Sequence, residues 1–366
     1  MEPRTQPNYF DLMARLGPDS VQKQEHTDVL SLSKGDIVAL VLLTPGAPEE
    51  KEDVYEYLCR QYLDELGAAS RGGYRIRHLF SRLMASRSLA PALDQVNAVG
   101  GGAALNLLTK DQSKALIAAV RRQATFSGDV KVLAYVASRF GSQSAANAIS
   151  QMKADEVNKV VLIPVFPSYA SALCDFSSSL WKGFQKGGDM SSVDTTWISP
   201  SFSSPGFAQS TNDRIEQALQ RYPGSIRNDV HIVFVARWSG QSAWIRRSTK
   251  IPAQVSETVA GIVQWSRRDY SFSIGHLGSG RFRPRNPFSI RTQLHMLRGA
   301  GKRAVLVVPV DHVSEQLDSA YRIDVQLRSL AAEFGFDEFH VASAVNCHPS
   351  FINSLAEQVT NRMRPV

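Results

Sequence analysis

The stretch IVFVARWSG, residues Ile232–Gly240, begins as an apolar run rich in β-branched residues and breaks off abruptly at Arg237. A short run of this kind, followed by polar and glycine residues, predicts a buried strand whose carboxyl end opens into a loop. In α/β proteins, ligands bind at the carboxyl ends of such strands. The stretch therefore predicts an α/β fold and puts Arg237, followed by Trp238, at the mouth of a cleft.

Similar apolar runs, each followed by a helical pattern, lie on both sides of this stretch. Asp36–Leu43 (DIVALVLL) is almost continuously apolar, which is typical of a parallel strand covered on both faces. Strands that alternate with helices at this spacing predict doubly wound parallel sheets. Further strands are predicted at 131–140, 159–169, 303–310 and 339–345, and helices at 49–66, 114–122, 212–221, 255–265, 318–334 and 350–362.

Chain length predicts two domains, because 366 residues exceed one ordinary core. A segment rich in Ser, Pro and Gly, from about Cys174 to Gln209, is typical of a connector. We expect an N-terminal extension over residues 1–35, a first lobe over 36–205 and a second lobe over 206–366. Each lobe is expected to be a Rossmann-like parallel sheet flanked by helices, facing the other across a cleft, with the last helix packing back on the first lobe.

Composition is that of a soluble globular protein, with 43% hydrophobic and 20% charged residues. No transmembrane segment is expected, because no apolar run reaches the roughly 18 residues that a spanning helix needs. The 41 basic and 34 acidic residues give a net charge of +7, which favours anionic partners without specifying them. Three scattered cysteines can build neither a disulfide framework nor a four-cysteine metal site, and they suggest a reducing compartment.

The densest charge feature is the basic run from Arg267 to Arg303. It contains the candidate patch for an anion or a partner, Arg281, Arg283, Arg285 and Arg291. An acidic protein or anionic lipid headgroups fit this run, whereas nucleic acid is a weaker candidate because no recognised nucleic-acid module accompanies it. A solvated face is the commonest explanation of such runs.

Other residue patterns are weaker indicators of a site. Gly100–Gly102 precede a helix and could admit an anion, but the spacing is neither a Walker loop nor a dinucleotide fingerprint, and a tight turn is the commoner explanation. His276, His295 and His348 lack a second ligand at metal-binding spacing, so surface or hydrogen-bonded histidines are expected instead. No metal cofactor is predicted.

Seven motifs follow one another from about Asp36 to Val359. They are LLTPGAPEEKEDV (42–54), VGGGAALNLLTKDQ (99–112), FPSYA (166–170), DFSSSL (175–180), IPAQVSETV (251–259), VPVDHVSEQLDSAY (308–321) and NCHPSF (346–351). In this order they resemble the motifs LLNxGGPxxxEDV, GGGSPxxxxTxxQ, YPQYS, TGSSL, YPxEVxxT, SDHxETLYE and NGNPxF of ferrochelatases. These are two-lobed α/β enzymes that insert ferrous iron into protoporphyrin to make haem. The resemblance implies their fold.

The first departure from the family lies where its chemistry is expected. The family has FSAHSLP where this chain has FVARWSG, so that Arg237 stands at the position of the catalytic histidine. Removing pyrrole protons and admitting a metal both need a neutral group with a lone pair, which imidazole provides. Guanidinium has no lone pair and stays charged, so Arg237 cannot do this work. It could hold a carboxylate or phosphate, or pair with an acid across the cleft.

The second departure lies in Asp269–Ser289, where the family's WQSxxGPxxWLxP pattern forms part of the porphyrin pocket wall. Here both tryptophans and the glutamine are missing, and three arginines make the wall basic. Other cleft positions are retained, although Glu315 matches the family's glutamate only if one residue is inserted at Ser314. The resemblance assigns to the porphyrin cleft Arg139, Phe140, Tyr169, Trp238, Asp311, His312 and Glu315.

Two hypotheses follow. The first is a ferrochelatase-like protein that has lost catalysis and serves as a subunit of a larger, mitochondrial assembly, with a cytoplasmic location as the alternative. It has other protein subunits as partners and no cofactor, because the family's iron–sulfur cysteines are absent, and no bound porphyrin or haem is expected. The second is an active ferrochelatase or tetrapyrrole binder in which His312 and Glu315 remove protons and Arg139 or Arg237 grips a propionate. A network at a strand end that fixes a loop would explain Asp311 as well as either function does.

Overall fold

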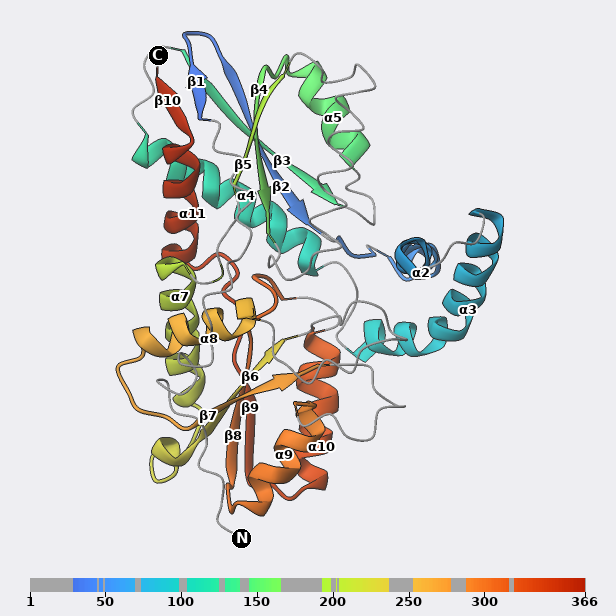
Figure 1. Cartoon of the computed structure of the whole chain (residues 1–366), viewed down its shortest axis with the longest axis vertical. Coiled ribbons are helices and arrows are strands. Elements are labelled where there is room, and N and C mark those ends of the chain that lie inside the picture. The colour runs from blue at the N-terminus through green and yellow to red at the C-terminus, as the bar shows by residue number, and fades with distance from the viewer. Residues whose placement is uncertain are drawn as a thin grey trace.

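The chain folds into two parallel four-stranded sheets covered by helices, as its computed structural model shows (Figure 1). The structure describes residues 29–44, 46–48, 50–69, 74–98, 104–124, 129–138, 145–165, 193–198, 202, 204–236, 253–277, 288–315 and 319–365. The predicted α/β architecture with two sheet-containing lobes is confirmed. Both sheets direct the carboxyl ends of their strands toward the middle of the molecule, as the arrowheads of β2 and β6 show in Figure 1.

The first lobe is built on the sheet of order β3-β2-β4-β5, in which every pair is parallel. Its strands are β2 (Ile37–Thr44), β3 (Lys131–Ser138), β4 (Lys159–Pro164) and β5 (Asp194–Trp197). Alternate residues of β2 belong to different cores: Val38, Leu40 and Leu42 pack with α4 (Ala104–Gln123), and Ala39 and Val41 pack with α5 (Ala145–Ala154). Helices thus cover both faces of β2, which explains its uninterrupted apolar sequence.

The second lobe repeats the plan with the sheet order β7-β6-β8-β9, again entirely parallel. Its strands are β6 (His231–Ala236), β7 (Phe272–His276), β8 (Ala304–Pro309) and β9 (Glu338–Val341). One face is covered by α7 (Pro205–Leu219) and α8 (Ala253–Trp265), and the other by α9 (Ile290–Gly299) and α10 (Leu327–Glu333). A π-helical segment, η2 (Ser319–Gln326), leads into α10, and a short turn, η1 (Arg227–Asp229), precedes β6.

The two lobes are joined through α11 (Pro349–Asn361), which packs on α4 of the first lobe and on α7. One apolar core runs through this contact and reaches both sheets. The crossing of α7 and α11 is close, because a Cβ atom placed on Gly206 would lie 2.3 Å from Cβ of Ser354. Only glycine fits there without displacing α11.

The first and last strands of the described residues pair with each other. β1 (Leu30–Leu32) and β10 (Met363–Pro365) form a parallel two-stranded ribbon in which Leu30 lies opposite Met363. Leu30 and Leu32 are buried in the shared core. These residues fall inside the predicted extension 1–35, so the folded body begins at least as early as Leu30. Three residues are too short a run for a sequence pattern to mark a strand.

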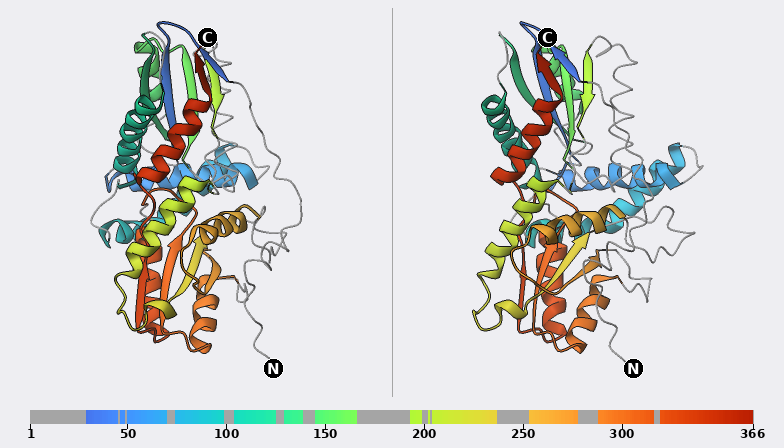
Figure 2. Two further views of the ribbon diagram at one scale, coloured as in Figure 1. Left: turned by 90° about the vertical axis from the view of Figure 1, so that its left-hand side faces the viewer. Right: turned by 60° about the vertical axis from the view of Figure 1, so that its left-hand side comes forward.

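Two helices stand apart from both sheets. α2 (Asp53–Ala69) and α3 (Tyr74–Ala98) pack on each other and project from the side of the molecule at the level between the sheets (Figures 1 and 2). No helix was predicted over the residues of α3. Its sequence is apolar on two sides of the helix and contains Pro91, so it lacks the single apolar stripe that reveals an amphipathic helix.

Three elements correct the sequence-based picture of the connections. β5 lies within the predicted connector at 174–209, and α7 begins there at Pro205, capped by Ser204, rather than near Asn212. β7 occupies residues that were predicted to form a pocket wall. β5 and β7 are edge strands of only four and five residues with mixed burial, so neither carries the continuous apolar signature of β2 and β6.

Candidate functional site

The polar residues that follow β8 lie beside the end of β6. The ladder between these strands continues past Pro309, because the Val310 amide donates a hydrogen bond to the Val235 carbonyl oxygen over 2.9 Å. Asp311 and His312 come next, and both are buried. The structure therefore puts this pair at the carboxyl edge of the second sheet, where the resemblance expects cleft residues. Arg237, which follows β6 in sequence, lies outside the described residues.

Asp311 and His312 form a closed pair. His312 Nδ1 donates to Asp311 Oδ1 over 2.7 Å, and the two side chains are only 1% and 4% exposed respectively. A proton on Nδ1 leaves the lone pair of the neutral ring on Nε2. Among the described residues, His312 Nε2 has no hydrogen-bond partner, and neither has the buried Ser314 hydroxyl. The pair thus holds an imidazole lone pair in a fixed orientation inside the protein.

Glu315 is part of a loop network. Its carboxylate accepts a hydrogen bond from the Ala344 amide over 2.7 Å, and its own amide donates to the Asn346 side chain over 3.0 Å. Asn346 has a positive φ of 49° and donates its amide hydrogen to the Val313 carbonyl oxygen. Glu315 therefore fastens the segment after β8 to the loop after β9. One oxygen of the Glu315 carboxylate is thus already engaged by a backbone amide.

This network also connects the two lobes. Gln112, from α4 of the first lobe, donates from its side chain to the Asn346 carbonyl oxygen over 3.0 Å. Nearby in sequence, the Asn106 side chain donates to the Ala47 carbonyl oxygen over 3.1 Å. Both residues belong to the motif VGGGAALNLLTKDQ, and their partners belong to other quoted motifs. The polar side chains within these motifs were the available sequence signal for such a network. Their partners could not be read from the sequence, because Gln112 and its partner are more than 200 positions apart.

Most of the predicted cleft and patch residues lie outside the described part of the chain. These are Arg139, Phe140, Tyr169, Arg237, Trp238, Arg281, Arg283 and Arg285. Arg291 is described and lies on α9, where it donates to Glu333 over 2.9 Å and stands 5.3 Å from the Phe334 ring. Its charge is offset by an acid of α10. Arg291 therefore contributes less to an anion-binding patch than its sequence neighbourhood suggested.

The histidines considered as metal ligands have other contacts. His348 caps α11, accepting from the Ser350 amide, and its Nε2 lies 3.4 Å from Asp213. Burial lowers the pKa of His348, so its neutral form is favoured. His295 packs edge-on against the Phe334 ring. Within the described ranges, no group of three or more His, Cys, Asp or Glu side chains gathers at metal-binding distance.

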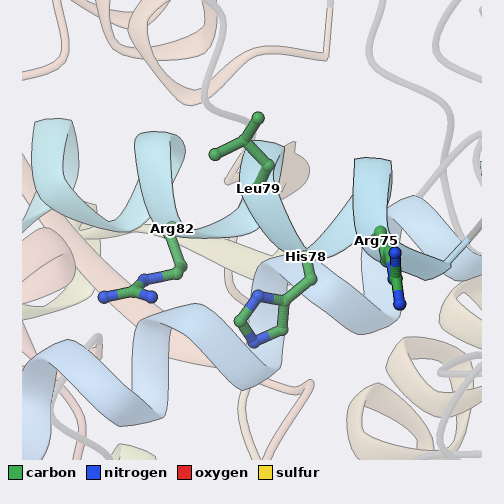
Figure 3. A pocket seen from close by; sticks show the side chains of 4 residues that line it. All are labelled: Arg75, His78, Leu79 and Arg82. Carbon is green, nitrogen blue, oxygen red and sulfur yellow. The ribbon is translucent and has the colours of Figure 1, made fainter.

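A shallow hollow of about 330 Å³ lies on the projecting arm rather than between the sheets. It is lined by Arg75, His78, Leu79 and Arg82 of α3, and Figure 3 shows both Arg82 and His78 turned toward α2 while Leu79 points away. Arg82 Nε donates to the Tyr55 hydroxyl of α2 over 3.5 Å. The hollow is open and basic, which suits one acidic side chain better than a macrocycle.

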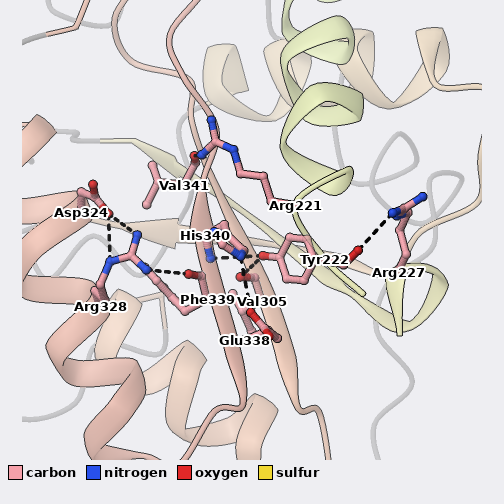
Figure 4. Close-up of polar contacts among 10 residues, drawn as sticks. All are labelled: Arg221, Tyr222, Arg227, Val305, Asp324, Arg328, Glu338, Phe339, His340 and Val341. Atoms are coloured by element: carbon pink, nitrogen blue, oxygen red, sulfur yellow. Dashed lines mark hydrogen bonds and ion pairs between the residues drawn. The ribbon is translucent and has the colours of Figure 1, made fainter. Parts of the chain in front are cut away.

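A second polar cluster, around β9, closes the edge of the second sheet (Figure 4). The buried Tyr222 hydroxyl donates to the Val305 carbonyl oxygen over 2.6 Å and accepts from the His340 amide over 3.2 Å, so it bridges β8 and β9. Burial raises the pKa of Tyr222 and lowers that of His340. Arg328 and Arg221 donate to carbonyl oxygens of β9. These contacts satisfy an edge strand, and the cluster is structural.

Comparison with known proteins places the chain among chelatases. The family model for ferrochelatases matches residues 37–363. The ferrochelatase of Nostoc punctiforme is 27% identical over 330 residues, covering 89% of this chain and 82% of its own; that of Gloeobacter violaceus is 26% identical over 331 residues, covering 89% and 98%. SirB from Bacillus subtilis, solved with Fe3+, aligns with a TM-score of 0.50 at 10% identity, covering 89% and 95% of the two chains. At that identity the likeness concerns the fold alone.

Proposed function

This chain belongs to the ferrochelatase family, and we propose that it is a non-catalytic member that serves as a structural or interaction subunit of a larger, mitochondrial assembly. The proposal starts from Arg237. In the motif alignment this residue stands where the family has the histidine that serves proton removal, metal contact or both. An arginine there offers no lone pair and repels an approaching divalent cation.

The observation that carries the proposal is that the groups that could replace the histidine are already engaged within the protein. His312 is only 1% exposed and is held by Asp311, and the Glu315 carboxylate is bonded to the Ala344 amide. A general base must come within hydrogen-bond reach of the proton it removes. A buried His312 and a Glu315 engaged with backbone support a scaffold better than they support metal insertion.

The overall charge of the chain supports an interaction role. A net charge of +7 attracts anionic surfaces, and an acidic protein subunit is the partner class we propose. No helix in the described residues has the length and apolar character needed to cross a bilayer. Mitochondrial localisation is part of the proposal and rests on the family's location in eukaryotes and on the residues that precede the first lobe.

The test is a metallation assay of the purified full chain with protoporphyrin and ferrous or zinc ions, run beside a ferrochelatase of the cyanobacterial type as positive control. We expect no insertion above the uncatalysed rate. The matched variant Arg237→His asks whether that residue alone is responsible, and we expect it to stay inactive because residues 269–289 still lack the two tryptophans and the glutamine of the family's pocket wall. Metallation by the unmodified chain at rates near those of the control would overturn the proposal.

The assembly is tested separately by native purification from the cells that make the protein, with absorbance recorded on the eluate. We expect companion polypeptides in constant stoichiometry and no Soret band. A chain that elutes alone and coloured would contradict the subunit role. Fractionation of the same cells tests the mitochondrial location, which a purely cytosolic pool would refute.

One observation favours a second candidate, an active ferrochelatase or tetrapyrrole binder with a rearranged site. The buried Nε2 of His312 has no hydrogen-bond partner among the described residues, and such an orphaned atom calls for a ligand, water or ion. The Nostoc and Gloeobacter relatives are moreover named ferrochelatases. In this candidate, His312 with Glu315 removes the pyrrole protons.

A porphyrin titration separates the two candidates. Soret displacement and tryptophan quenching that disappear in His312→Gln, but persist in the control variant His295→Gln, would establish the second candidate. An unchanged Soret band and unchanged tryptophan emission at saturating porphyrin would leave the non-catalytic subunit as the function.

A further inference from the structure

The outward side of α3 carries an apolar stripe that nothing in the described structure covers. Ile76, Leu79, Phe80 and Leu83 are 57%, 70%, 53% and 44% exposed. Their spacing of three, four and seven residues puts them side by side on one face over two helical turns. We call these four residues the α3 stripe.

The α3 stripe is distinct from the side by which α3 packs. Ser81, Ala85 and Val96 are buried. At 100° per residue these positions lie roughly opposite the stripe. The helix therefore buries one face within the protein and exposes a second, apolar face. Packing of the arm formed by α2 and α3 does not account for this second face.

Exposed apolar side chains are concentrated in this stripe. Among the described residues nine large hydrophobic side chains are exposed, and four of them form the α3 stripe. The others, Val29, Leu107, Trp265, Met296 and Val325, come from five separate places in the chain. Single exposed apolar residues are ordinary, whereas a contiguous group marks an interaction surface.

The charge around the stripe defines the partner. α3 carries Arg75, Arg77, Arg82 and Arg87, and its only acid, Asp94, comes more than two turns beyond the stripe. Arg75 and Arg82 both lie along the edge of the stripe next to Leu79. With Leu79 they line the hollow of about 330 Å³, although Figure 3 shows Leu79 pointing away from the side to which Arg82 turns. A hollow next to an apolar ridge receives a protruding side chain, and the arginines select a carboxylate.

From these features we infer that the α3 stripe docks an amphipathic helix of an acidic protein partner. The apolar face of that helix covers Leu79 and its neighbours, and one of its carboxylates enters the hollow between Arg75 and Arg82. In this mode of binding, the docked helix contributes apolar anchor residues at the same helical spacing as the residues of the stripe. A lipid surface matches the stripe less well, because it has no protruding carboxylate to fill a hollow. The inference rests on the proposed function, since it names the surface through which the subunit joins its assembly.

The test puts a photo-crosslinking residue into the full chain, expressed in the cells that normally make it, as Leu79→p-benzoylphenylalanine. The matched control is Met296→p-benzoylphenylalanine on α9, where the native side chain is 59% exposed. After irradiation, we expect one protein adduct at position 79, attached to a helical segment with apolar residues at the stripe's spacing and acidic flanks. Arg75→Glu should reduce that adduct about tenfold, because a like charge then faces the carboxylate. Arg122→Glu on α4 makes the same charge change elsewhere and should leave it intact.

Four results would overturn the inference: no adduct at 79, equal adducts at 79 and 296, an adduct to a second copy of this chain, or an adduct to lipid. Sedimentation of the purified chain with phosphatidylcholine–phosphatidylserine vesicles checks the lipid result independently. We expect no cosedimentation that depends on Leu79. Failure here is distinguishable from failure of the proposed function. If companion proteins copurify but no adduct forms at position 79, only the assignment of this surface is refuted. If the chain metallates porphyrin, the proposed subunit role is refuted whatever the crosslinking result.

Discussion

The segment after β8 and the outward face of α3 differ in which kinds of side chain they bury and which they expose. After β8, Asp311 and His312 are buried and bonded to each other, and the partly buried Glu315 accepts a hydrogen bond from a loop amide. On α3, Leu79 and Phe80 are more than half exposed. Chains ordinarily expose charge and bury apolar surface, so both regions depart from the common arrangement.

The difference fits the proposal that this protein meets a partner through α3. The hydrogen bonds of Asp311 and Glu315 stabilise the segment at the carboxyl edge of the second sheet. A contiguous group of exposed apolar side chains marks a surface that another molecule covers. The contrast therefore predicts that substitutions after β8 affect stability, and that substitutions on α3 affect association.

Asp311→Ala should be the most damaging change. It removes the acceptor of a buried histidine, and breaking a buried pair of this kind costs about 3 kcal/mol of unfolding free energy. Urea denaturation followed by circular dichroism measures it. The control Asp311→Asn keeps an oxygen acceptor and should lose less. An increase in stability in either variant would indicate a strained functional site instead, and the contrast with α3 would fail.

Another buried histidine, at the opposite end of β6, extends the comparison to pH. His231 bonds to Ser271 and Ser273, and burial lowers its pKa to about 3. The unfolded chain takes up a proton near pH 6.5 and the folded chain does not, so stability falls as pH drops below 6.5 toward 3. At pH 5 the expected loss is about 2 kcal/mol.

His231→Asn isolates this term, because asparagine can still bond to serine but does not titrate. Unfolding free energies measured between pH 7 and 5 should fall less steeply for the variant than for the unmodified chain. Parallel curves would mean that His231 is protonated in the folded protein.

Glu315→Ala should have an intermediate effect. Loss of the hydrogen bond to the Ala344 amide is worth about 1 kcal/mol, because the group is only partly buried. Glu315→Gln retains an acceptor and should recover most of the loss. The same two variants have a second use in the porphyrin titration: if both abolish binding equally, the carboxylate charge serves a ligand rather than the loop.

Leu79→Ser should have the smallest effect on stability, within about 0.5 kcal/mol, because its side chain is 70% exposed. Association should nevertheless be lost, as judged by native gel migration of the complex from the source cells. Met296→Ser removes a similarly exposed apolar group and should change neither property. A large drop in melting temperature for Leu79→Ser would show that the stripe packs within the molecule.

Sequence patterns predicted the elements that are buried on both faces. The apolar runs of β2, β6 and β8 stand out because helices cover each of these strands on two sides. The short, partly exposed β5 and β7 do not have that signature. α3 was missed for the opposite reason: with two apolar faces it shows no single period, and that second face is the feature of interest.

The candidate site was predicted in part. Asp311 and His312 were placed at a strand end, and they lie there. Their surroundings could not be predicted, because the loop that holds Glu315 comes from Ala344 and Asn346, and Gln112 reaches it from the other lobe. Local periodicity carries no information about contacts between segments so distant in sequence. Arg237 and most of the basic patch remain predictions.

The ribbon of β1 and β10 has a consequence for synthesis of the protein on the ribosome. β1 precedes both four-stranded sheets in the sequence and its partner β10 follows them, so β1 keeps an open edge while everything between the two strands is translated. A variant that stops before Met363 would contain both four-stranded sheets and α11 but leave Leu30 and Leu32 without their strand partner. β1 therefore gains its strand partner only after both sheets and α11 have been made.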